Sequence, residues 1–426
     1  MYRRKNRKKI VFIISALLIF CAAGIGGVLA YRCINERRTA AAVSISTDAG
    51  DTADLQDAES VSENGAPETA SETTESAESE TEEDDTVLQE RVKVKGIYVT
   101  GPMAGSSSME DLIRLIDETE LNTVVIDVKN DEGNITYQMD METVQNMGAC
   151  INYISDMESL MTTLKEHNIY TIARIVCFKD PCLAQARPEL ALKKADGTAV
   201  TDAYGLAWVN PCEAGVWEYL TEVALAAADM GFDEVQYDYV RFPIGTDADA
   251  ADYGVVMESD TREKMITGFL SYATKRLHEK GIPVSADVFG TIIGSEVDIE
   301  RVGQNYTAMA DTIDVLSPMV YPSHYGNGVF GYRVPDAEPY GTVFAALTDS
   351  NKELQAVKET DRAIVRPWLQ AFTATWIDGH ISYGGEQIRE QIQAVYDAGY
   401  EEWILWNARN HYESEGLLPD SGATSD

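Results

Sequence analysis

Residues 231–243 read GFDEVQYDYVRFP and combine a strand with a carboxylate at its end. The β-branched and aromatic residues in the middle of this run favour a strand, and Pro243 has no backbone N–H with which to continue one. Because side chains alternate along a strand, Gln236 and Asp238 face the same side. The run therefore predicts an acid at the carboxyl end of a strand, with Arg241 just beyond it. The alternative for an isolated acid of this kind is a loop or helix cap.

Similar runs recur through the rest of the chain. Strands are predicted at 95–100, 123–128, 170–177, 234–239, 283–288, 313–320, 363–369 and 402–406. Between them, apolar residues spaced three and four apart predict helices at 109–119, 157–167, 214–230, 262–280, 299–310, 343–359 and 386–398. Eight strands alternating with helices over roughly 330 residues favour a single α/β (β/α)8 barrel of the TIM type over an open doubly wound sheet. No dinucleotide or phosphate-loop fingerprint is present to favour the open sheet.

The loop lengths indicate which end of the barrel carries the site. The connections that lead from helices into strands are short, whereas those that leave the strands are long and rich in polar and aromatic residues, at 180–213, 243–260, 322–340 and 371–385. Barrel active sites are built from the loops at the carboxyl ends of the strands. We therefore expect the functional residues at that face.

The strand ends supply carboxylates, basic groups and aromatic rings. In addition to Asp238, Arg241 and Asp287, they present a set of candidate substrate-binding residues: Asp127, Lys129, Arg174, Tyr321, His324, Trp368, Gln370 and Trp406. Paired acids can protonate or attack at an anomeric carbon, and flat rings can hold pyranose rings, so this mixture is typical of sugar chemistry. No metal-ligand spacing is found, and the chemistry needs no cofactor. The alternatives are a structural ion pair for Asp127 and a loop cap for His324.

The N-terminal ninety residues have a different composition. Residues 1–9 carry six basic side chains, and residues 10–30 form an uncharged, mostly apolar run. Such a run is long enough to cross a bilayer, and the flanking charges predict a cytoplasmic N-terminus. A cleaved signal peptide, which would make the protein secreted, is the alternative. Residues 31–90 are predicted to be an acidic Ser/Thr/Glu-rich stalk, which would tether an extracytoplasmic barrel domain at 91–426.

Charge and cysteine content limit the partners. The net charge is −36, which argues against nucleic acid as a partner because such binding depends on basic surfaces. Cys182 and Cys212 each follow a proline in loops between the same two strands, and a disulfide between them would persist outside the cell. We expect a monomer whose partners are a polysaccharide or oligosaccharide substrate and, through residues 10–30, the membrane.

Several motifs together resemble a known family. The runs VVIDVKND, IARIVCFKDP, WVNPCEAGVWEY, GFDEVQYDYVRFP, SADVFG, LSPMVYPSHYG, RPWLQAF and WILWNA occur in this order. The chain is similar in these runs to a bacterial family of barrel domains, often exported, that is classed with glycoside hydrolases but has no assigned function. By similarity to barrel glycosidases, Asp238 would be the nucleophile and Asp287 the acid/base. The chain departs from the family pattern at Ala371 and Asn130, where the family tends to have acids.

The sequence thus predicts a glycoside hydrolase acting on a cell-envelope or extracellular polysaccharide. Arg241 would keep Asp238 ionised, and Asp127 with Lys129 would bind sugar hydroxyls. The alternative function is a non-catalytic surface protein that binds glycan through the same aromatic cleft. The sugar, the anomer and the choice between retention and inversion stay open at this point.

Overall fold

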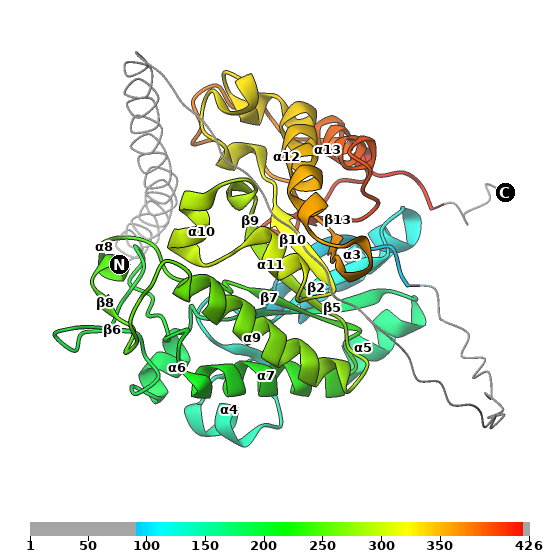
Figure 1. Ribbon diagram of the computed structural model, residues 1–426. Helices are drawn as coiled ribbons and strands as arrows, with labels where there is room; N and C mark the ends of the chain where they lie inside the picture. The colour runs from blue at the N-terminus through cyan, green and yellow to red at the C-terminus, as the bar shows by residue number, and fades with distance from the viewer. Residues whose placement is uncertain (1–90, 421–426) are drawn as a thin grey trace, which may run out of the picture. The chain divides into compact units, whose positions relative to one another are not determined.

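The computed structural model describes residues 91–420, and their core is a closed barrel of eight parallel strands (Figure 1). Each strand pairs with the next in chain order, and the last pairs with the first. This closure confirms the predicted (β/α)8 barrel. The strands are β1 Lys95–Val99, β2 Thr123–Lys129, β5 Tyr170–Val176, β7 Glu234–Asp238, β9 Val284–Phe289, β10 Val315–Met319, β12 Trp368–Gln370 and β13 Trp403–Trp406.

Helices cover the outside of the barrel (Figure 1). The long ones are α3 Met109–Glu118, α5 Met157–Glu166, α7 Ala214–Asp229, α9 Thr261–His278, α12 Pro339–Glu353 and α13 Gly385–Asp397. The single helix predicted at 299–310 is instead two, α10 Glu296–Val302 and α11 Tyr306–Ala310. Gly303 separates them with a φ of 77°, and a Cβ there would lie 2.7 Å from the carbonyl oxygen of Arg262. Only glycine fits this turn without strain, so the helix has to end.

The long loops contain short elements that the sequence did not predict. After β2 the chain turns back into β3 Ile135–Tyr137, which pairs antiparallel with β2, and then continues through α4 Glu142–Met147 into β4 Cys150–Ile154. The seventh barrel strand is interrupted at Pro367, which leaves β11 Ile364–Val365 before β12. The remaining short α-helices and strands are α2 Gly101–Ala104, α6 Pro181–Ala186, β6 Lys193–Lys194, α8 Thr246–Asp249 and β8 Ala251–Asp252.

The amino-terminal half of the barrel interior holds a buried ion network. Arg366, fully buried, donates through Nη1 to Glu234 Oε1 at 2.7 Å and through Nε to Glu402 Oε2 at 2.9 Å. Ser285 Oγ also donates to Glu234 Oε1, at 2.6 Å. Charges taken out of water in this way are tolerated only because each has a close partner. The network therefore links β7 and β9 to Arg366, just before β12, and to Glu402, just before β13.

One expectation is not tested by the described residues, and another is wrong. The membrane helix at 10–30 and the stalk at 31–90 lie outside the described residues; within 91–420, none of the helices combines the length and apolar character that a membrane span requires. The disulfide between Cys182 and Cys212 is not formed, because both are free thiols. Instead, Cys182 lies at the start of α6 and its Sγ donates to Asn134 Oδ1 at 3.2 Å, in the turn after β2.

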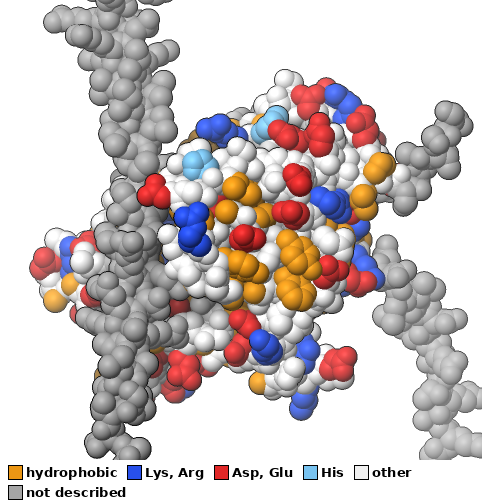
Figure 2. Space-filling view, turned by 90° about the horizontal axis from the view of Figure 1, so that it is seen from above, with side chains coloured by type: hydrophobic (Ala, Val, Ile, Leu, Met, Phe, Trp, Pro, Cys, Tyr) orange, Lys and Arg blue, Asp and Glu red, His pale blue; other side chains and the backbone are white. Residues whose placement is uncertain are grey.

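The surface is mixed in character where Figure 2 shows it, from above the view of Figure 1. Acidic side chains are scattered across this face, the basic ones are separated from one another, and hydrophobic side chains gather near its centre. On α12, Tyr340 and Phe344 are exposed and stack with their ring centroids 5.8 Å apart. No continuous basic surface of the kind that binds a nucleic-acid backbone is visible on this face.

The buried network predicts a large loss of stability for one substitution. Arg366→Met would remove the guanidinium that neutralises Glu234 in the barrel interior, so we expect the free energy of unfolding to fall by about 3–5 kcal/mol. The matched control is Lys93→Met, because Lys93 forms an exposed pair with Glu401 at 2.8 Å. This control should change the free energy by less than about 1 kcal/mol. Urea titration of both variants measures the difference, and equal effects would contradict the network's role.

Candidate active site

The centre of the site is Arg174 of β5. Its Nε and Nη2 donate to Asp238 Oδ2 at 3.0 and 2.6 Å, and its Nη1 donates to Asp127 Oδ1 at 2.6 Å. The barrel explains this fork, because β5 lies between β2, which carries Asp127, and β7, which ends in Asp238. A guanidinium group stays charged at any ordinary pH and holds two carboxylates in fixed positions. One arginine therefore fixes both acids.

The backbone next to Asp238 is strained. Tyr239 has a φ of 50°, in the left-handed region that aromatic residues rarely adopt. In this conformation the Tyr239 N–H donates to Asp238 Oδ1 at 2.6 Å. Both oxygens of Asp238 thus accept hydrogen bonds, one from Arg174 and one from the backbone. Backbone strain of this kind is concentrated at functional sites, and here it fixes the orientation of a carboxylate.

A second carboxylate, Asp287, follows on the neighbouring strand β9 and is 1% exposed. Trp368 Nε1 donates to its Oδ1 at 2.7 Å. Burial raises the pKa of Asp287 well above its ordinary range, and the negative charge of nearby Asp238 raises it further. The hydrogen bond from Trp368 and the charge of Arg174 act in the opposite direction but are weaker. Asp287 is therefore the acid of the pair that keeps its proton.

Asp127 is also surrounded by donors. Its Oδ1 is held by Arg174, and Tyr98 Oη donates to its Oδ2 at 2.6 Å. Burial raises the pKa of Asp127 to about 6, against the lowering effects of Arg174 and Tyr98. The side chain is buried and both oxygens are occupied, so in this structure Asp127 positions Arg174. The structural ion pair with Arg174, one of the alternatives considered from the sequence, is formed.

Arg241 lies near Asp238 but is not its direct partner. No hydrogen bond or ion pair joins it to Asp238; it lies instead over the rings of Trp208, Tyr239 and Phe289, and its Nη1 donates to the Phe242 carbonyl at 3.1 Å. The cation that neutralises Asp238 is Arg174, which lies 64 residues earlier in the chain. Arg174 could have been found from the sequence, because it occupies an inward-facing position of β5, the strand next to β7.

Two more of the expected binding residues are occupied elsewhere. Lys129 is fully buried, pairs with Asp180 at 2.9 Å and donates to the Val176 carbonyl at 2.6 Å. An irregularity in the pairing of β2 with β5 lies between Asp127 and Lys129. Gln370 is also fully buried; its amide donates to Asp336 Oδ1 at 2.9 Å and accepts from the Ser323 N–H at 3.0 Å. These side chains anchor loops around the site rather than line it.

The aromatic residues at the strand ends form one connected wall. Trp406 stacks on Tyr98 at 6.2 Å, lies 5.8 Å from Tyr321 and meets Phe372 edge-on at 5.3 Å. Trp376 stacks on Phe372 at 5.9 Å and is 38% exposed. The wall therefore leads from the acids to the surface, and its two outer rings, in the loop after β12, were not among the residues predicted.

Further polar side chains complete the rim. His324 is exposed, and its ring lies 5.1 Å from that of Tyr321. On the opposite side, Lys179 Nζ lies 3.4 Å from Asp131 and 3.7 Å from Asp202. Burial alone would raise the pKa of Asp131, but Arg174 and Lys179 together lower it. Within residues 91–420, no three His, Cys, Asp or Glu side chains are grouped as metal ligands would be.

The raised pKa of Asp287 predicts how stability depends on pH. An acid whose pKa rises on folding favours the folded state less as the pH increases above its unfolded value. Asp287→Asn removes this titration and keeps an oxygen that can accept from Trp368. We therefore expect the variant to have a higher Tm than the wild type at about pH 7, with a gain that shrinks toward about pH 4.

Thermal unfolding at several pH values measures this effect. Asp311→Asn is the matched control, because Asp311 is exposed, and it should leave the Tm unchanged. A gain of the same size at both pH values, or a loss at neutral pH, would show that the pKa of Asp287 is not raised by folding.

The chain is similar to several known proteins. Residues 96–412 match a family model described as "Putative glycosyl hydrolase domain". Among solved structures, a hypothetical protein from Ruminiclostridium thermocellum ATCC 27405 is 35% identical, with 45% of this chain and 97% of that one covered and a TM-score of 0.41. The glycoside hydrolase domain of PgaB (BpsB) from Bordetella bronchiseptica is 13% identical, with 75% and 95% covered and a TM-score of 0.51, a likeness of fold. No curated protein matches the chain.

Proposed function

Since the chain belongs to the family of putative glycosyl hydrolase domains, we propose that it cleaves glycosidic bonds of a polysaccharide through Asp238 and Asp287. The observation that carries the proposal is the unequal environment of these two acids. Asp238 is paired with the guanidinium of Arg174, whereas burial raises the pKa of Asp287. Glycosidases require such a pair, with one carboxylate charged and the other protonated.

The roles follow from the contacts. Asp238 attacks the anomeric carbon, while Asp287 gives its proton to the glycosidic oxygen, so that the leaving sugar departs as a neutral alcohol. In the second step a water molecule loses a proton to Asp287 and releases the sugar from Asp238. Arg174 and the Tyr239 N–H hold Asp238 in position for both steps. Trp368 does the same for Asp287.

The aromatic wall supports a substrate longer than one sugar. Trp376 is stacked on Phe372, which contacts Trp406, so exposed ring surface extends beyond the residues next to the acids. Aromatic faces bind the apolar faces of sugar rings without requiring a particular charge. We therefore infer that further sugar units rest on the outer rings while one linkage lies at the acids.

Substitution of each acid separates their roles. Asp238→Asn should abolish turnover of every substrate while binding is retained. Asp287→Asn should slow substrates with poor leaving groups by roughly 10²–10⁴-fold, the usual contribution of general acid catalysis, and should slow activated aryl glycosides much less because they need little protonation. Rates on an oligosaccharide and on an aryl glycoside measure the difference, with Asp311→Asn as the control.

Two outcomes would contradict the assignment. Full activity of Asp287→Asn on both substrate types would move the proton-donating role to another group, of which Asp127 is the first candidate. If the wild type binds glycan without cleaving it, and Asp238→Asn binds with the same affinity, the non-catalytic alternative is established.

The outer wall makes a separate prediction. Trp376→Ala should raise KM for an oligosaccharide by about 2- to 10-fold, the range expected for one aromatic contact, and should leave KM for a short aryl glycoside unchanged. Phe344→Ala is the matched control, because Phe344 is an exposed ring on α12. An equal effect of Trp376→Ala on both substrates would mean that Trp376 supports the loop and does not hold sugar.

We propose that residues 10–30 anchor the protein, with the barrel domain outside the membrane. The support is the basic run before this apolar segment. Protease added to intact cells should release the domain from a membrane-bound, full-length chain. A mature protein beginning at Tyr31 in the medium would instead indicate a cleaved signal peptide.

A further inference from the structure

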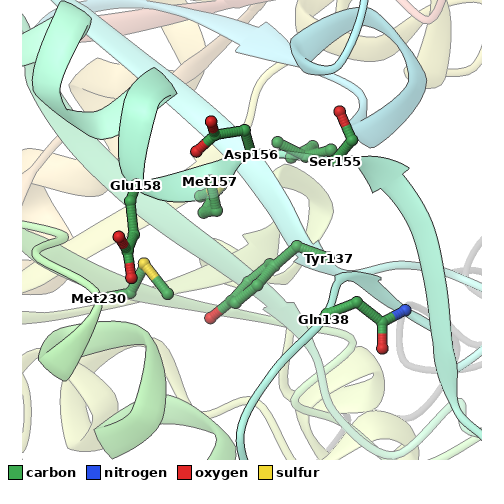
Figure 3. Close-up of a pocket in the computed structure, with 8 residues that line it drawn as sticks. Tyr137, Gln138, Ser155, Asp156, Met157, Glu158 and Met230 are labelled. Atoms are coloured by element: carbon green, nitrogen blue, oxygen red, sulfur yellow. The ribbon is translucent and has the colours of Figure 1, made fainter.

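A pocket that is open to solvent, called the cavity below, lies outside the barrel and away from the aromatic wall. It has a volume of about 180 Å³ and is formed by the ends of β3, β4 and α7 together with the start of α5 (Figure 3). Its lining residues are Tyr137, Gln138, Ile154, Ser155, Asp156, Met157, Glu158 and Met230. None of these residues contacts the acids of the proposed active site. Since a water molecule occupies about 30 Å³, the cavity has room for a ligand of roughly six non-hydrogen atoms or slightly more.

One polar group in this cavity has no partner. Tyr137 is 1% exposed, and among the described residues no group forms a hydrogen bond with its hydroxyl. Figure 3 shows the hydroxyl pointing toward Met230, on the side to which the carboxylate of Glu158 also points. Burial raises the pKa of Tyr137, so the phenol stays neutral. Buried hydroxyls are normally paired, so an unpaired one that lines a cavity indicates a missing ligand or water.

The charges around this hydroxyl all have one sign. Asp156 and Glu158 contribute carboxylates, and no Lys, Arg or His is among the lining residues. Asp156 uses Oδ1 to accept from the Ser159 N–H at 2.9 Å, at the start of α5. Glu158 is exposed to solvent, and among the described residues its side chain has neither a hydrogen bond nor an ion pair. The cavity is therefore rich in acceptors and lacks a cationic donor.

The rest of the lining is mixed, because Gln138 and Ser155 are polar whereas Ile154, Met157 and Met230 are apolar. Ile154 and Met157 are buried, and Met230 brings a flexible thioether beside the free hydroxyl. Methionine side chains adapt to hydrocarbon of varied shape. A bare divalent cation fits poorly, because calcium takes six to eight oxygen ligands and no group of three metal-binding side chains is found in the described part of the chain. A short hydrocarbon that ends in a positive charge can contact both the apolar side chains and the carboxylates of this lining.

We propose that this cavity binds the protonated amino group of a small aliphatic amine. An ammonium group has three donors and no acceptor. It would donate to the Tyr137 hydroxyl and to the Glu158 carboxylate, while Asp156 adds negative potential and Met157 and Met230 pack against the hydrocarbon. The amine could be a free alkylamine or diamine, or the amino group of an amino sugar. The site is independent of Asp238 and Asp287, so it goes beyond the proposed glycosidase activity.

Binding by the full-length chain tests the proposal, with saturation-transfer NMR to detect contact and calorimetry to measure Kd. The probes are 1,4-diaminobutane and glucosamine, each with a neutral counterpart, 1,4-butanediol and N-acetylglucosamine. At least one amine should bind, and its neutral counterpart should bind about tenfold more weakly or not at all, as expected when a charge-assisted hydrogen bond is lost. Diamine binding would indicate a free amine as the ligand, and glucosamine binding an amino sugar.

Variants locate the binding. Tyr137→Phe keeps the ring and removes the hydroxyl, and Glu158→Gln keeps the shape and removes the charge; each should weaken amine binding by about tenfold. Glu166→Gln is the matched control, because Glu166 is an exposed acid on the same helix, and it should bind as the wild type does. The proposal is overturned if neither amine binds, if the neutral counterparts bind equally well, or if Tyr137→Phe and Glu158→Gln bind with unchanged Kd. The rate of glycan hydrolysis should be the same in all three variants.

Discussion

The candidate active site depends on one buried arginine that is shared by two acids. Arg174 is held inside the barrel with Asp127 on one side and Asp238 on the other. Burying these charges costs several kcal/mol per ion unless each has a close partner, so the three groups stabilise one another only as a set. Because the guanidinium cannot lose its proton, the set carries one fixed positive charge. That charge lies against Asp238, whereas burial raises the pKa of Asp287, the proton donor of the proposed mechanism.

The barrel interior contains two such sets, one near each end of its strands. Arg366 with Glu234 and Glu402 occupies the amino-terminal half, where nothing in the proposed chemistry reaches. Arg174 with its acids occupies the carboxyl ends, beside the aromatic wall. In each set one arginine pairs with two carboxylates. The set at the amino-terminal half stabilises the barrel, and the set at the carboxyl ends belongs to the candidate active site. Only the Arg174 set lies beside the aromatic wall that leads to the surface, and only this set has Asp287, an acid with a raised pKa, next to it.

The fold could be predicted because the evidence for it is local. Alternating runs and their turn residues placed the eight strands close to their observed bounds, whereas β3, of three residues, and β4, inside an irregular loop, carry too little pattern to be recognised. Asp238 and Asp287 could be found from their place at strand ends. Their partners could not, because pairing depends on strand register. Arg241 is near Asp238 in sequence but is directed onto aromatic rings, and Lys129 is drawn to Asp180 where the pairing of β2 becomes irregular.

The central claim is that a negative charge on Asp238 helps to keep the proton on Asp287, and ¹³C NMR of the aspartate carboxyl groups in the full chain tests it directly. Asp287→Asn identifies the resonance by its disappearance. In the wild type this resonance should stay at its protonated position well above about pH 4, the usual value for aspartate, and in Asp238→Asn it should titrate at a lower pH than in the wild type. Titration near pH 4 in both proteins would contradict the claim.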